Sequence, residues 1–136
     1  MSASPILALR RSARAALLAD AGLTAALGGL HVFDEAPPRQ PRPYVTFADA
    51  SSRDWSVDLS SGDEQQFTLT VWSSERGVHE ALEIAGRIVT LLADAALTLS
   101  GHRLVNLSYS GVTTKREQGG RLARADIRFR ATTEVI

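Results

Sequence analysis

The 136-residue chain has no cysteine, one methionine and one lysine. The absence of cysteine excludes disulfide bonds, thiolate metal sites and thiol nucleophiles. No run approaches the ~18 consecutive apolar residues that a membrane-spanning helix needs. The first 22 residues carry their arginines behind the first apolar residues and lack a continuous apolar core. They make a poor secretory signal, so we expect a cytoplasmic protein.

The chain also lacks an excess of either charge, with fifteen basic and fifteen acidic residues. Their distribution is uneven. Residues 1–44 carry five arginines against three acidic residues, residues 45–100 three against nine, and residues 101–136 seven basic residues against three acidic ones. Acidic and basic blocks can attract copies of one chain head to tail; solvated faces without partners are the alternative. The length predicts a single domain, residues 1–136, with its own core.

The stretch Phe67–Leu92 predicts a strand followed by a helix. Residues 67–72 alternate between apolar and polar types, which is typical of a half-buried strand. From Val78 the apolar spacing changes to about 3.6 residues, and the predicted apolar stripe includes Leu82. Ser73 and Ser74 are expected to cap the start of this helix. Its wide apolar face must be covered, and the sheet that contains the strand is the nearest candidate surface.

The rest of the chain predicts an α+β fold. Ser4-Pro5 is a typical helix start, Gly22 is expected to end that helix, and a short turn precedes Gly28. Short strands are expected at 30–33, 44–47, 54–59, 105–110 and 122–131, with a polar loop at 48–54. Four of the five prolines lie in residues 37–43. This segment is interpreted either as a stiff connector or as a surface that docks on a partner. The predicted architecture is one mixed, mostly antiparallel sheet, with an N-terminal and a central helix on one face and a protruding β-hairpin.

The sequence predicts no catalytic, cofactor or metal site. The three histidines share no spacing, and in His79-Glu80-Ala81-Leu82-Glu83 the second histidine of the helical zinc motif is replaced by Glu83. No serine lies in a Gly-x-Ser-x-Gly motif, and neither glycine pair fits a phosphate loop. A group of carboxylates has serine neighbours, which indicates solvated charges; these are Asp49, Asp54, Asp58, Asp63 and Glu64.

Three arginines of the last predicted strand, Arg124, Arg128 and Arg130, lie on one face because their spacing is even. Such a row can bind phosphate oxygens. However, no aromatic residue interleaves with it and Asp126 interrupts it. Ion pairs across strands or between subunits are therefore the favoured interpretation, with nucleic-acid binding as the alternative.

Ordered motifs now suggest a family. They are Pro5-Ile6-Leu7-Ala8-Leu9; Leu27-Gly28-Gly29 before His31-Val32-Phe33-Asp34; Pro43-Tyr44-Val45-Thr46; Asp54-Trp55-Ser56; Thr68-Leu69-Thr70-Val71-Trp72-Ser73; Gly77 before Glu80-Ala81-Leu82; and Leu97-Thr98-Leu99 before Gly101-His102-Arg103-Leu104-Val105. Over about residues 5–105 the chain resembles the tail-completion, or tail-terminator, proteins of long-tailed bacteriophages and phage-derived gene transfer agents.

The resemblance implies a structural virion protein. Family members form a six-fold ring at the head-proximal end of the tail tube, end tube polymerisation and join the tail to the head connector. The implied partners are copies of itself, the tail tube protein and a connector or stopper protein, with DNA only as passing cargo and no membrane or cofactor. The host cytoplasm and then the particle tail are the expected locations. The expected interface residues are Arg39, Arg42, Asp49, Arg53, Asp54, Asp58, Asp63, Glu80, Glu83, Arg87, Arg124, Arg128 and Arg130.

Two alternatives remain open from the sequence. Within the same class, the chain could be another ring protein of the neck, such as an adaptor or a stopper. From a different class, it could be a small soluble enzyme or ligand-binding domain. A deep pocket with convergent polar groups would favour the second alternative.

Overall fold

The computed structural model describes residues 4–56, 61–117 and 122–136. In this part of the chain, five strands form one sheet in the order β1-β2-β3-β5-β4; β1 is parallel to β2, and the other neighbours are antiparallel. The elements are α1 (Pro5–Leu18), α2 (Ala21–Leu27), β1 (Val32–Phe33), β2 (Tyr44–Asp54), β3 (Gly62–Ser73), α3 (His79–Leu92), β4 (His102–Glu117) and β5 (Leu122–Val135).

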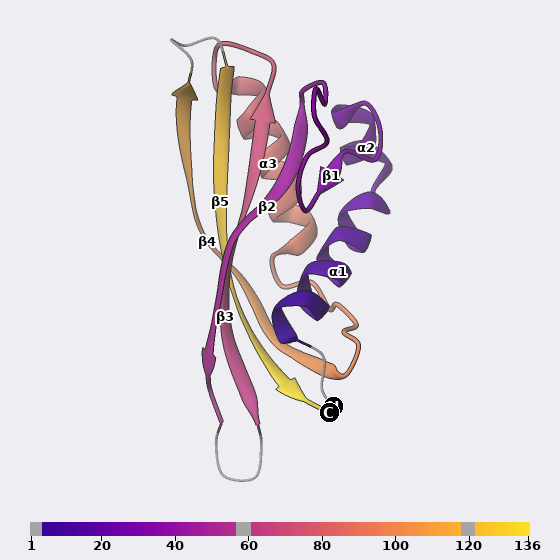
Figure 1. Cartoon of the computed structure of the whole chain (residues 1–136), viewed down its shortest axis with the longest axis vertical. Coiled ribbons are helices and arrows are strands. Elements are labelled where there is room, and N and C mark those ends of the chain that lie inside the picture. Colours follow the sequence, from indigo (N-terminus) through magenta and orange to yellow (C-terminus); the bar gives the residue numbers. More distant parts are fainter. Residues whose placement is uncertain (1–3, 57–60, 118–121) are drawn as a thin grey trace.

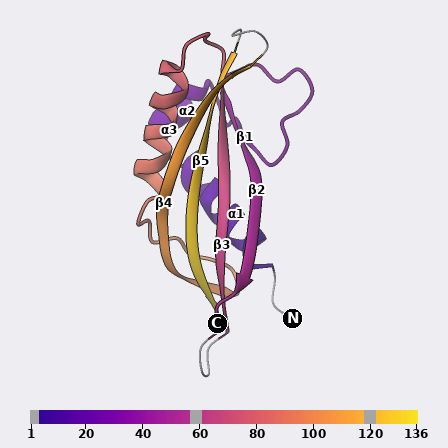
Figure 2. The ribbon, with the colours of Figure 1, turned by 90° about the vertical axis from the view of Figure 1, so that its left-hand side faces the viewer.

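The molecule has two layers. The helices lie together on one side of the twisted sheet (Figure 1), and the view turned by 90° shows them behind one sheet face while no helix covers the other (Figure 2). We call this uncovered side the open face. The arrangement confirms the predicted α+β class, with the N-terminal and central helices on the same face.

The core lies between the helices and the sheet. Strand β3 contributes Phe67, Leu69 and Val71, and β5 contributes Ile127 and Phe129, all buried. Helix α3 covers them with a stripe made of Ala81, Ile84, Ala85, Ile88 and Leu92. Leu82, which we expected in this stripe, is 40% exposed. That expectation was wrong because the apolar pattern was read wider than the surface that the sheet covers.

The N-terminal helix ends earlier than the sequence predicted. Ser4 caps α1 by accepting a hydrogen bond from the Leu7 backbone, as expected. The helix then ends at Leu18, and Gly22 lies inside α2. Asp20 explains the difference, because its carboxylate accepts a hydrogen bond from the Leu23 backbone and so starts a new helix. Gly28 ends α2 in the left-handed conformation, with φ 79°.

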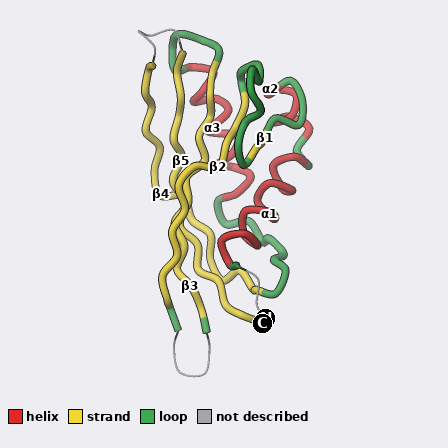
Figure 3. The backbone as a smooth tube through the Cα atoms, in the orientation of Figure 1, coloured by secondary structure: helices red, strands yellow, loops and turns green. Residues whose placement is uncertain are grey.

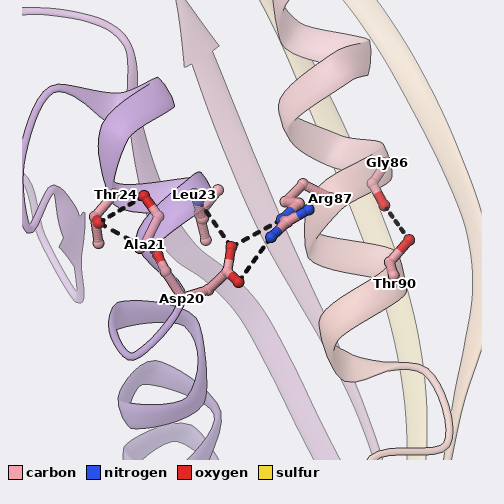
Figure 4. A network of polar contacts seen from close by, with 7 residues as sticks. All are labelled: Asp20, Ala21, Leu23, Thr24, Gly86, Arg87 and Thr90. Carbon is pink, nitrogen blue, oxygen red and sulfur yellow. Dashed lines mark hydrogen bonds and ion pairs between the residues drawn. The ribbon is translucent and has the colours of Figure 1, made fainter.

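Asp20 also ties this helix pair to the central helix (Figure 4). Arg87 of α3 donates two hydrogen bonds of 2.8 Å to the two carboxylate oxygens of Asp20. The Arg87 hydrogen bond, together with that from the Leu23 backbone, holds the pKa of Asp20 below its ordinary value. One carboxylate therefore both caps α2 and fixes it beside α3.

We expect the Asp20→Asn variant to be less stable than the wild type at neutral pH. The amide can still cap α2 but cannot form the ion pair. Because the folded-state pKa of Asp20 is lowered, its stabilising effect is complete above the unfolded-state pKa, about 3.9, and is lost as the pH falls through the folded-state value. The urea midpoints of the wild type and of Asp20→Asn, measured from pH 7 to pH 3, should therefore approach each other at the acid end of this range. A gap that stays constant over this range would contradict the role of the charge.

The start of α3 differs from the expectation. Ser73 and Ser74 do not cap the helix, which has no side-chain cap hydrogen bond. Instead, Glu80 of the first turn accepts hydrogen bonds from the Ser73 hydroxyl at 2.7 Å and from the Ser74 backbone at 3.1 Å. The carboxylate thus lies near the positive end of the helix and holds the preceding loop.

The polar stretch 48–54 is a strand rather than the expected loop. β2 continues to Asp54, and its ladder with β3 extends from Tyr44↔Trp72 to Asp54↔Asp63 with one irregularity between Phe47 and Ala50. Most side chains of this stretch are exposed to solvent, which fits their polar character, while the backbone is paired with β3. Figure 3 shows both strands continuing beyond the helices, which confirms the protruding hairpin. The strand expected at 54–59 is wrong for Trp55 and Ser56, because β2 ends at Asp54; residues 57–59 lie outside those described.

Candidate assembly surface

The open face carries a network of ion pairs between strands. Glu64 of β3 is only 7% exposed and accepts hydrogen bonds from Arg130 of β5 at 2.8 Å and from Arg53 of β2 at 3.1 Å. The Arg130 hydrogen bond, supported by Arg53, lowers the pKa of Glu64 although burial acts in the opposite direction. The sequence prediction of a solvated Glu64 was therefore wrong, because adjacent strands bring a cation to each side of it.

A second group of polar contacts lies at the other end of this face. Arg124 forms ion pairs with Glu117 at 2.9 Å and with Asp126 at 3.5 Å, and its guanidinium lies 5.6 Å from the centre of the Trp72 ring. Asp126 also accepts a hydrogen bond from Thr70 at 2.7 Å. Cross-strand ion pairing, the interpretation favoured from the sequence, is thus confirmed for Arg124 and Arg130.

Arg128 has a different environment. Its guanidinium passes over Gly111 of β4, where a side chain would come within 2.9 Å of it, and donates to the Thr113 hydroxyl at 2.9 Å. Within the described part of the chain it has no ion pair, and Asp49 has none either. Both side chains line two neighbouring open depressions of about 450 and 370 Å³. Two charges on this face are therefore free to meet a partner.

The other predicted interface residues lie on three surfaces. Asp54 and Asp63 are near the end of the β2–β3 hairpin, where they accept hydrogen bonds from Ser56 and Ser52. Glu80, Glu83 and Arg87 lie on α3, on the helical side, and Arg39 and Arg42 lie on the loop between β1 and β2. Asp58 is outside the described residues. The open face therefore brings together Asp49, Arg53, Arg124, Arg128 and Arg130.

Sequence reasoning missed the acidic and aromatic partners of these arginines. Thr70 and Trp72 lie far from Asp126 and Arg124 along the chain, whereas Glu117 ends the preceding strand β4; all three become neighbours through strand pairing. The alternation of β3 was the available signal, since it puts Thr70 and Trp72 on the face opposite the core. The alternation alone does not show which strand lies beside β3, so it could not pair these residues with Arg124 and Asp126.

We next consider metal binding and membrane insertion within the described ranges. They contain no group of three or more histidine and acidic side chains that could hold a metal ion. His79 pairs with Glu83 at 2.9 Å on an exposed turn of α3. Among the helices described, none is long and apolar enough to cross a membrane.

These features define a class: small α+β proteins whose helices cover one sheet face and whose other face is a broad, charged surface with shallow depressions. Proteins of this kind can act through contact with other proteins.

The chain belongs to the tail completion protein family: residues 12–134 match the family described as Tail completion protein gp17. A chain in the solved structure of the virion of a native gene transfer agent (GTA) particle is similar to it, with 30% identity and a TM-score of 0.88. The similarity covers 98% of this chain and 99% of that one. None of the curated protein sequences matches this chain. The family expected from the ordered sequence motifs is thus confirmed.

Proposed function

We propose that this chain is the tail terminator of a phage-like particle. It forms a ring on the head-proximal end of the tail tube, ends tube polymerisation and joins the tail to the head connector. The observation that carries the proposal is the end-to-end similarity to a chain of a gene transfer agent virion, at 30% identity over 98% of the sequence. Membership of the tail completion family supports it.

The structure suits a steric mechanism without bond chemistry. A closed ring needs two different and complementary surfaces on each subunit. The single domain, residues 1–136, offers a charged open face, a helical side and a protruding hairpin. A bound ring would hide the surface that the next ring of tube protein needs. The product is then a tube of fixed length whose end is ready for the head.

The partners in this function are six copies of the chain, the tail tube protein and a connector or stopper protein of the head. DNA passes through the ring as cargo, and a channel lined by acidic residues would repel its phosphates. Our candidates for such a lining are some of Asp49, Asp54, Asp58 and Asp63, of which Asp58 lies outside the described residues. The remaining proposed interface residues are Arg39, Arg42, Arg53, Glu80, Glu83, Arg87, Arg124, Arg128 and Arg130.

Particles made without this gene product test the proposal. We expect heads without joined tails and free tubes of variable length, seen by electron microscopy, because nothing stops tube growth. A copy of the gene supplied on a plasmid should restore joined particles with tails of one length. Free tails of normal length would instead indicate a neck adaptor or stopper, and normal joined particles would reject an assembly role.

A further inference from the structure

Each outer edge of the sheet is paired over only a part of its length. β1 pairs with β2 only at Val45 and Thr46. At the other edge, the backbone of Asp94 donates to the Leu107 carbonyl and Thr98 bridges to Arg103. Within the described residues, no backbone group pairs with the outer edge of Asp49–Asp54 in β2 or of Gly111–Glu117 in β4. Each edge thus keeps one free segment able to accept another strand.

The free segments have compatible directions. Three antiparallel ladders separate β2 from β4, so these strands run in opposite directions. A rotation about the ring axis keeps the up or down sense of each strand, even where the strands are tilted from that axis. In a ring built by such rotations, β4 of one copy therefore meets β2 of the next as an antiparallel pair, which is the pattern of the rest of the sheet.

The free segments lie at different heights, and the offset fits a closed sheet. Ser51 pairs with Gln66, which in turn pairs with Arg130 of β5. Thr113 pairs with Asp126 of the same strand, four residues from Arg130. Four residues span about 14 Å, and four strands are about 19 Å wide. Joining the segments then tilts the strands by about 35°, within the range of about 35–45° that closed sheets adopt.

Charge and side-chain direction select a register. Lys115 and Thr113 pair with Arg124 and Asp126 and so share the open face. On β2, Asp49 and Ser51 lie on that face too, as both line one of its depressions. Placing Ser51 opposite Thr113 puts Asp49 opposite Lys115. Neither charge has an ion pair in the described residues, and a shift by two residues would lose this attraction.

We propose that the ring forms by strand addition between copies of this chain: the free segment Gly111–Glu117 of one copy pairs with Asp49–Asp54 of the next, and Lys115 meets Asp49 across the interface. This inference rests on the proposed ring function and specifies its subunit contact. Because the two segments differ, each contact is head to tail and the series can close into a ring.

Charge reversal tests the contact between copies. Asp49→Lys and Lys115→Asp each place like charges at every interface, so each alone should reduce joined particles at least about tenfold. Both residues are exposed, so purified variants should keep the wild-type melting temperature. Expressing the two variants together should restore joined particles, because a six-membered ring in which they alternate has opposite charges at every contact. Failure of the mixture to recover would overturn the proposal.

Cross-linking gives an independent measurement in a chain that has no cysteine of its own. In particles that carry Ser51→Cys together with Thr113→Cys, oxidation should produce a ladder of linked chains on a non-reducing gel. The matched control is Ser51→Cys with Thr90→Cys, since Thr90 lies exposed on α3, and it should give no ladder. Assembled particles that yield only single chains from the first variant, or the same ladder from both, would overturn strand addition.

The deletion experiment separates the two proposals. If particles without the gene product have normal joined tails, the proposed function itself fails. If the deletion gives unjoined heads and long tubes while mixed subunits do not recover and no ladder forms, the terminator function stands and the strand contact is wrong.

Discussion

Replacing Ile88 with aspartate should leave most of the chain unfolded at pH 7. Ile88 is fully buried on α3, between that helix and the sheet. The substitution removes a large apolar side chain and places a carboxylate where no cation is within the core cluster. We expect a loss of about 5 kcal/mol or more, comparable to the whole stability of a typical domain, about 5–15 kcal/mol. Circular dichroism and a urea titration measure the effect.

The same substitution at Leu82 provides the matched control. Leu82 is in the same helix but is 40% exposed. An aspartate there stays solvated and lies in the first turns of α3, where a negative charge is favourable. Leu82→Asp should therefore change stability by less than about 1 kcal/mol. Equal destabilisation by the two variants would show that α3 does not pack on the sheet in the way described.

Phe129→Ala is expected to be the second most damaging substitution. Phe129 is 1% exposed at the centre of β5; its ring centre lies 5.3 Å from that of Phe67 and 6.2 Å from that of Tyr109. Truncation removes both contacts and leaves a cavity that rigid strands cannot fill. A loss of about 3–5 kcal/mol follows from such large-to-small changes. The urea midpoint and its slope give this value directly.

Thr132→Ala is the control for the same strand. Thr132 is partly exposed on the open face, where no helix packs. Its truncation should alter stability by about 0.5 kcal/mol or less. If Phe129→Ala were as mild as this control, the aromatic cluster would not be part of the cooperative core.

Local sequence patterns determined most of the elements. The alternation in 67–72 and 122–131 gave the inward faces of β3 and β5, and both are as expected. The change of period at Val78 located α3, and Ser4 and Gly28 marked helix ends correctly. These signals are readable because the period of a helix or a strand is set by its own backbone. The family was also evident from the order of short motifs.

Local sequence patterns gave wrong predictions where contacts with other parts of the chain determine the structure. The strand at 48–54 resembled a loop because its side chains are polar, whereas its ladder with β3 depends on a distant partner. Gly22 resembled a helix end because glycine commonly is one, but the Asp20 carboxylate had already started α2 two residues earlier.

The tertiary structure alone decided which polar groups meet. Glu64 became a buried carboxylate between two arginines because β2 and β5 flank β3. The free edge segments also exist only because β1 and the residues after α3 each pair with just a part of one outer edge. Sequence periodicity specifies the direction of a side chain relative to its own strand. Neighbours across the sheet are set by the order and register of strands that are far apart along the chain.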